Sequence, residues 1–102
     1  MKLMTKELRR TIPGLYTTED NPDPLVYAKF FTPDSSWSWY AIEFDGEDIF
    51  FGLVVGLDTE LGYFSLVELE SVRGPLGLPI ERDRYFEPKT LSEVRELHER
   101  RR

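Results

Sequence analysis

Residues 37–55 read WSWYAIEFDGEDIFFGLVV, and this stretch decides the fold. Asp45-Gly46 is a strong hairpin signal, because both residue types tolerate the positive φ of tight turns and alternating apolar residues flank them. The pattern predicts two antiparallel strands, over residues 37–44 and 49–55, joined by a short turn.

The two faces of this hairpin can be sorted, because successive side chains along a strand point to opposite faces of the sheet. If Asp45-Gly46 form a two-residue loop, Ile42 opposes Ile49; a four-residue loop over residues 45–48 shifts the pairs but keeps the faces. One face is expected to carry Tyr40, Ile42 and Phe44, and the other Trp37, Trp39, Ala41 and Glu43, with Tyr27, Phe31 and Phe50 from the rest of the sheet. We expect this second, aromatic face to be covered by loops and the C-terminal helix, whereas an open aromatic face would be a recognition surface.

The rest of the chain supplies two more strands and three helices. Aromatic and β-branched runs predict strands over residues 25–32 and 60–64, with links too short for a parallel crossover. Helices are predicted over residues 5–12, with Thr5 as N-cap, and after the capping boxes SLVE (residues 65–68) and TLSE (residues 90–93), while residues 73–88 form a Gly- and Pro-rich loop. The predicted fold class is α+β: an antiparallel β-meander of about four strands packed with short helices, including N- and C-terminal helices, in a single domain over residues 1–102.

The composition excludes several kinds of catalytic site. The chain has no Cys, which removes disulfides, thiolate nucleophiles and sulfur-based zinc sites. Its one histidine, His98, lies near the end of the C-terminal helix, where we expect a surface position. We therefore expect no catalytic residue, no cofactor and no metal.

The chain is expected to be cytoplasmic and not to engage a membrane. Residues 1–13 lack the apolar region of a signal peptide. The longest apolar run, residues 49–57, is far shorter than the roughly 20 residues that cross a bilayer.

Charge is distributed unevenly along the chain, whose formal net charge is −6. Residues 13–72 hold twelve acidic residues and a single base, Lys29, whereas residues 1–12 and 73–102 each carry a basic excess. Solubility and pairing of the ends with the acidic centre are the simplest interpretation.

Three groups of residues are candidates for binding. The aromatic group is Tyr27, Trp37 and Trp39; the acidic hairpin group is Glu43, Asp45, Glu47 and Asp48; the charged-loop group is Arg73, Glu81, Arg82 and Asp83. The hairpin carboxylates are hard oxygen ligands, but they lack the spacing of a calcium loop, and acidic hairpin tips commonly protect sheet edges. The loop charges could clamp an anion, but internal ion pairs that pin the loop are favoured.

These candidates support three functional hypotheses. The favoured one is a non-enzymatic binding module, a monomer or weak homodimer, that engages a protein partner through the aromatic face and the acidic hairpin. The alternative is a single-stranded nucleic-acid binder that uses Trp37 and Trp39 as stacking platforms, with the basic residues Arg95, Arg100, Arg101 and Arg102. The least favoured is a small hydrolase, which would require Glu43, Asp48, Arg82 and Asp83 to meet in one cleft.

Several motifs also resemble a known family. They are FFTPDS (residues 30–35), WSWY (37–40), EFDG (43–46), FFGLV (50–54), ELGYFSL (60–66), ELESVRG (68–74) and GLPIERD (77–83). Together they resemble the uncharacterised bacterial family called domain of unknown function 2958, over nearly the whole chain. The resemblance implies an accessory role on plasmids, conjugative elements and phages, and it brings no catalytic residues with it.

Overall fold

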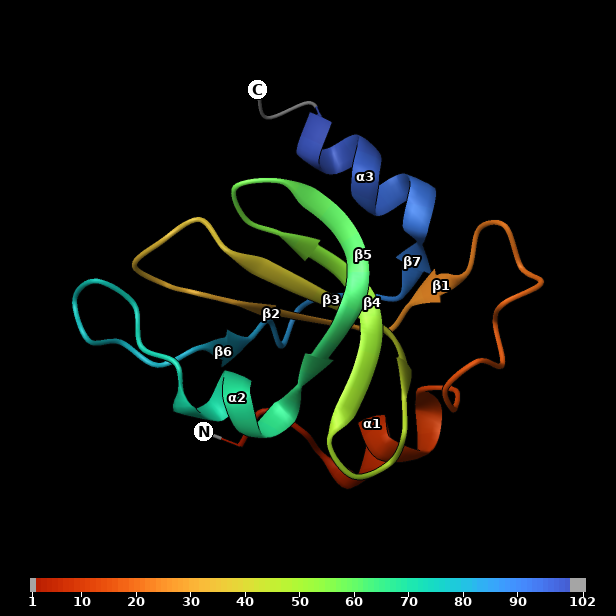
Figure 1. Ribbon diagram of the computed structural model, residues 1–102, viewed down its shortest axis with the longest axis horizontal. Helices are drawn as coiled ribbons and strands as arrows, with labels where there is room; N and C mark the ends of the chain where they lie inside the picture. The colour runs from red at the N-terminus through yellow and green to blue at the C-terminus, as the bar shows by residue number, and fades with distance from the viewer. Residues whose placement is uncertain (1, 100–102) are drawn as a thin grey trace.

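A computed structural model describes residues 2–99, and its centre is one antiparallel sheet of five strands (Figure 1). The strand order is β5-β4-β3-β2-β6, with bounds β2 Ala28–Phe31, β3 Ser38–Phe44, β4 Ile49–Val55, β5 Thr59–Ser65 and β6 Glu81–Arg82. A separate short pair joins β1 (Leu25–Val26) to β7 (Lys89–Thr90). The predicted α+β class and antiparallel meander are confirmed. Strands β6 and β7, in contrast, were not predicted, because each is only two residues long.

The β3–β4 hairpin contains an irregularity that changes its faces. Ala41 pairs with Gly52, but Glu43 pairs with Phe51, so Ile42 is an extra residue in β3. In such a β-bulge two residues oppose one, and the alternation of side chains shifts beyond it. The turn itself has four residues, 45–48, so the two-residue register is wrong.

Three helices begin at the expected caps. The helices are α1 (Lys6–Thr11), α2 (Leu66–Ser71) and α3 (Leu91–Glu99). The Thr5 hydroxyl accepts a hydrogen bond from the Leu8 amide at 3.1 Å, and the Ser65 hydroxyl accepts one from the Glu68 amide at 3.3 Å. Thr90 and Glu93 bond reciprocally, the Glu93 amide to the Thr90 hydroxyl and the Thr90 amide to the Glu93 carboxylate. This arrangement is a capping box.

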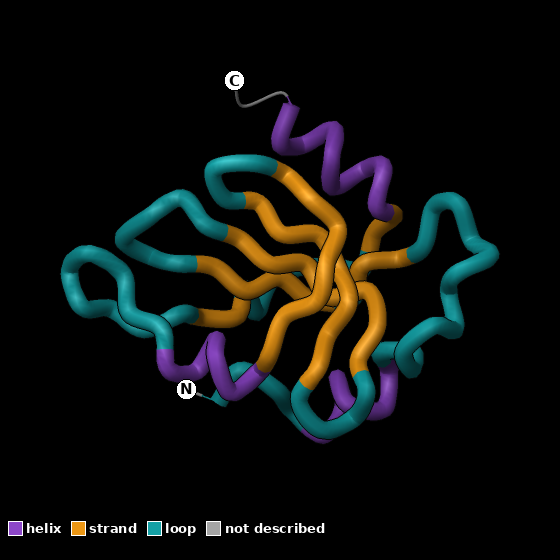
Figure 2. The backbone as a smooth tube through the Cα atoms, viewed as in Figure 1, coloured by secondary structure: helices purple, strands orange, loops and turns teal. Residues whose placement is uncertain are grey.

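Helices cover both faces of the sheet (Figure 2), and each face has its own apolar cluster. The first cluster contains Phe30, Ala41, Phe44 and Phe50 with Leu66 and Leu69 of α2, and Tyr27 and Trp39 pack against it. The second contains Val26, Tyr40, Ile42 and Leu53 with Leu91 and Val94 of α3.

The bulge and the register overturn part of the predicted face assignment. Phe44 lies in the cluster of Ala41, not in that of Tyr40 and Ile42, because the bulge at Ile42 shifts the alternation. Phe31 pairs with Ser38, and Lys29 Nζ lies 5.8 Å from the ring centroids of both Phe31 and Tyr40, so Phe31 lies on the face opposite Trp39.

Candidate functional site

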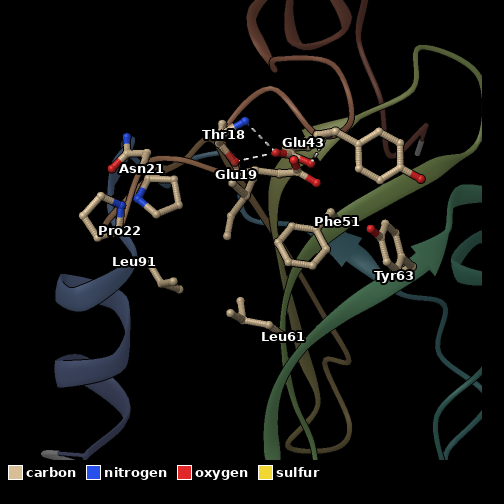
Figure 3. Close-up of a pocket in the computed structure, with 12 residues that line it drawn as sticks. Thr18, Glu19, Asn21, Pro22, Glu43, Phe51, Leu61, Tyr63 and Leu91 are labelled. Atoms are coloured by element: carbon tan, nitrogen blue, oxygen red, sulfur yellow. Dashed lines mark hydrogen bonds between the residues drawn. The ribbon is translucent and has the colours of Figure 1, made fainter.

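A pocket of about 270 Å³ opens on the α3 side of the sheet (Figure 3). One wall is formed by Leu61 and Tyr63 of β5, and the opposite wall by Leu91 at the start of α3. Ile42 and Phe51 line it from β3 and β4, and the loop between α1 and β1 contributes Tyr16, Thr18, Glu19, Asn21, Pro22 and Pro24. The pocket thus has an apolar interior and a polar rim.

Glu43 holds this loop in place. The residue is only 3% exposed, and its carboxylate accepts hydrogen bonds from the Tyr16 amide at 2.8 Å and the Thr18 amide at 2.9 Å, and also from the Thr18 hydroxyl. Burial by itself raises the pKa of Glu43, but these three donors outweigh it and keep the pKa below its ordinary value. Glu43 is therefore a charged structural anchor. It reaches the loop because the bulge turns both Ile42 and Glu43 toward the pocket.

The β5 wall of the pocket carries two large side chains that are exposed to solvent. Leu61 is 44% exposed and Tyr63 is 56% exposed, although both are on a sheet strand. The backbone of Tyr16 has a φ of +70°, in the left-handed region that few non-glycine residues adopt, and the Tyr16 side chain interacts with that of Tyr63. Partial burial and the neighbouring Tyr16 raise the pKa of Tyr63. The Tyr63 hydroxyl therefore stays protonated at neutral pH.

A second hollow, of about 410 Å³, lies further along the same two elements. It is lined by residues 55–57 and Thr59 of the β4–β5 hairpin and by Arg95, His98 and Glu99 of α3. Leu91, Arg95, His98 and Glu99 fall on one face of a helix, at spacings of four, seven and eight residues. We name the two hollows together the β5–α3 groove, with β5 residues Thr59, Leu61 and Tyr63 on one side and this face of α3 on the other.

His98 is more tightly held than the sequence indicates. Its Nε2 lies 2.6 Å from the hydroxyl of the buried Tyr40, and the two rings meet edge to face. The expectation of a plain surface position is wrong, because α3 packs its His98 face onto the sheet. Arg95 lines the second hollow, and Arg100, Arg101 and Arg102 lie outside the described residues.

The aromatic candidates lie on the other face of the sheet. Trp37 and Trp39 stack on each other with ring centroids 5.9 Å apart, and Trp39 and Tyr27 pack against the first core cluster. Trp37 covers Gly56 so closely that a methyl group there would lie 2.4 Å from its ring. Trp37 remains 38% exposed. This face is therefore largely covered, as expected, but the prediction that the C-terminal helix covers it is wrong: α2 packs on this face and α3 packs on the opposite one.

The acidic hairpin residues serve the local structure. Asp45 Oδ1 accepts the amides of Glu47 and Asp48 at 2.8 Å and of Ile49 at 3.0 Å, and these bonds lower the pKa of Asp45. Asp48 accepts the Ser65 hydroxyl at 2.8 Å and the Val67 amide at 2.8 Å, so it caps α2. Glu47 is exposed. Among residues 2–99, no group of three or more acidic or histidine side chains is placed to hold a metal ion.

The charged-loop candidates are also bound to backbone. Arg82 lies on β6 and its Nη1 donates to the Leu3 carbonyl at 2.8 Å, while Arg73 Nη1 donates to the Val72 carbonyl at 2.9 Å. The Asp83 amide donates to the Lys29 carbonyl at 2.9 Å, and Glu81 pairs with Phe31 in the sheet. The loop is thus pinned to strand β2.

The residues required by the hydrolase hypothesis do not share a hollow. Glu43 lines the first pocket, Asp48 caps α2, and Arg82 and Asp83 line a different pocket beside Thr5 and Tyr27. Sequence reasoning missed Tyr16, Glu19, Leu61 and Tyr63, which surround the pocket. The apolar residues of β5 alternate with Glu60 and Gly62, but this pattern indicates a half-buried strand as readily as an exposed edge.

The sequence was compared with models of known protein families. The model described as "Protein of unknown function (DUF2958)" matches residues 3–100. The chain belongs to this family. No curated protein and no solved structure matches the chain. None of the helices among residues 2–99 has the length and hydrophobicity that crossing a bilayer requires.

Proposed function

We propose that this DUF2958 protein is a non-enzymatic binding module that holds a protein partner in the β5–α3 groove. The observation that carries the proposal is the exposed apolar wall of Leu61 and Tyr63 beside a pocket of about 270 Å³. Concave, mostly apolar sites with a few polar groups at the rim are typical of binding sites. Singly exposed apolar residues are ordinary, but these two adjoin a pocket with its own apolar interior.

The charges of this region favour a protein over a nucleic acid. Glu19 lies at the pocket rim, and Lys29 is the only base among residues 13–72 against twelve acidic residues. Arg95 lines the second hollow, so this acidic excess, which repels phosphates, belongs to the segment that forms the first pocket. Trp37 and Trp39 stack on each other on the opposite face, so they do not line the groove.

The pocket offers little for catalysis. Glu43 is the buried carboxylate of the pocket, and all three of its hydrogen bonds hold the Tyr16–Thr18 segment. Its lowered pKa makes it a poor proton donor or acceptor near neutrality. An accessory role on mobile genetic elements in the bacterial cytoplasm rests on the family resemblance alone.

Selection from a random peptide display library tests the proposal. The bait is the wild-type protein, and the variants are Leu61→Arg, which places a long charged side chain in the groove, and Leu76→Arg, which adds the same group on an exposed loop. We expect peptides that bind the wild type and Leu76→Arg proteins and lose binding to Leu61→Arg. Peptides that bind all three equally, or a library that yields none, would remove the groove as a protein-binding site.

A further inference from the structure

Strand β5 is an edge of the sheet with free backbone groups. Its pairing with β4 starts at the turn, where the Gly56 amide donates to the Asp58 carbonyl at 2.9 Å, and ends where the Leu66 amide donates to the Asp48 carbonyl at 2.8 Å. Hydrogen-bonded pairs alternate along an antiparallel ladder, so the bonded residues of β5 are Glu60, Gly62 and Phe64. The amides and carbonyls of Thr59, Leu61 and Tyr63 therefore face away from β4.

The same three residues also line the groove. Leu61 and Tyr63 border the first pocket, and Thr59 borders the second hollow. The residues of β5 whose backbone groups are free therefore also supply the β5 side chains of the groove. Within residues 2–99, no other segment donates to or accepts from these backbone groups. A chain added beside β5 would lie about 4.8 Å from it, on the side away from β4, next to the Leu61 and Tyr63 wall of the pocket.

The first pocket suits a long basic side chain. Ile42, Phe51 and Leu61 offer apolar contact for an alkyl stem, and the exposed Glu19 lines the same pocket as Tyr16 and Tyr63. Lys and Arg bury such stems while their charged heads stay near water, carboxylates or aromatic faces. Outside the pocket, Asp58 and the exposed Glu60 extend the negative charge along the same edge.

A second copy of the chain fits this edge poorly. Antiparallel pairing of two full β5 strands would place Glu60 of each copy opposite Phe64 of the other, so the acidic side chains of the edge would gain no partner of opposite charge. The charge of the edge instead complements a basic segment.

We infer that the partner contributes an extended peptide segment that adds to β5 as a sixth strand and places a Lys or Arg side chain in the pocket beside Glu19. This is recognition by strand addition, in which backbone bonds supply affinity and pockets for alternate side chains supply specificity. The inference rests on the proposed function and specifies the conformation and charge of what binds.

Amide hydrogen exchange with a peptide selected on the wild-type protein tests the backbone part. In the free protein we expect Leu61 and Tyr63 amides to exchange rapidly and Glu60, Gly62 and Phe64 amides to be protected. With peptide bound, Leu61 and Tyr63 should become protected as well. Binding without new protection at Leu61 and Tyr63 would overturn strand addition. Concentration-dependent protection of these amides without peptide would assign the edge to a second copy.

Charge variants test the side-chain part by fluorescence anisotropy with the same peptide. We expect Glu19→Lys to weaken binding about tenfold, and replacement of the peptide's basic residue with Gln to have a similar effect. Glu87→Lys, the same charge change on an exposed loop, should alter affinity by less than about twofold. Equal effects of Glu19→Lys and Glu87→Lys would overturn the basic-residue assignment. A library that yields no peptide would instead defeat the proposed function itself, so the two failures are distinguishable.

Discussion

Replacing Glu43 with Gln is the sharpest test of how the pocket is built. The substitution keeps the size of the side chain but leaves one acceptor oxygen where the carboxylate has two, while the Tyr16 amide, the Thr18 amide and the Thr18 hydroxyl all donate to it. At least one backbone amide then faces the NH₂ group of the substituted side chain, at a position where the wild-type residue is only 3% exposed.

The expected loss follows from these bonds. A hydrogen bond to a charged group contributes about 1.5–3 kcal/mol to stability. The substitution weakens more than one such bond, but it also removes the cost of burying a charge, which offsets part of the loss. We expect Glu43→Gln to lower the free energy of unfolding by about 2–3 kcal/mol, and the melting temperature by roughly 10–20 °C for a domain of this size. Glu47→Gln, on the exposed hairpin tip, should change stability by less than about 0.5 kcal/mol.

The pH dependence gives this test a second readout. Because the folded-state pKa of Glu43 lies below its ordinary value of 4.5, its contribution is complete above that value and is lost as the pH falls through the folded-state pKa. We therefore expect the difference in the free energy of unfolding between wild type and Glu43→Gln, measured by urea unfolding, to be smaller at acidic pH than at neutral pH. Wild-type stability for Glu43→Gln at pH 7, or a gap that does not change with pH, would refute the anchoring role.

Three further predictions concern the sheet and its surfaces. Gly52→Ala should destabilise the fold by about 3 kcal/mol or more, because a Cβ at residue 52 would lie 1.7 Å from the Tyr40 carbonyl oxygen. Gly62→Ala, at the position paired with Gly52, should be nearly neutral, because a Cβ there would meet nothing within 4 Å. Urea unfolding measures both variants, and equal effects would contradict this reasoning. Asp48→Ala should cost about 1–2 kcal/mol by removing the cap of α2, measured by thermal unfolding against Glu47→Ala, and a neutral result would show that the cap is dispensable. Single-stranded DNA should leave tryptophan fluorescence unchanged at low salt, because Trp37 and Trp39 stack on each other and Trp39 packs on the core; saturable, salt-sensitive quenching would restore the nucleic-acid hypothesis.

Local signals in the sequence predict much of this fold. Thr5, Ser65 and Thr90 each cap a helix as expected, because the capping preference depends only on neighbouring residues. The hairpin at Asp45-Gly46 and the antiparallel order also follow from short-range patterns. Strand β6 does not, because two residues, Glu81 and Arg82, carry no periodicity, and only the distant strand β2 makes them a strand.

The candidate site was far less predictable. The bulge at Ile42 reverses the alternation within β3, and no residue type there signals it, so Glu43 was placed on the aromatic face although it reaches the pocket. In the sequence, Leu61 and Tyr63 look like ordinary core residues of a strand. Strand β5 lies at the edge of the sheet because no later strand of the chain pairs with its open side, and that depends on the whole fold. Conversely, the conspicuous residues Asp45, Asp48 and Arg82 are occupied by hydrogen bonds within the protein.

The most direct test of the central claim is chemical-shift mapping of the protein with a peptide selected on it. We predict that the perturbed amides gather along β5 and the facing side of α3, including Leu61, Tyr63, Leu91 and Arg95. Perturbations confined to Trp37 and Trp39, or to the loop around Arg82, would contradict the assignment of the β5–α3 groove as the binding site.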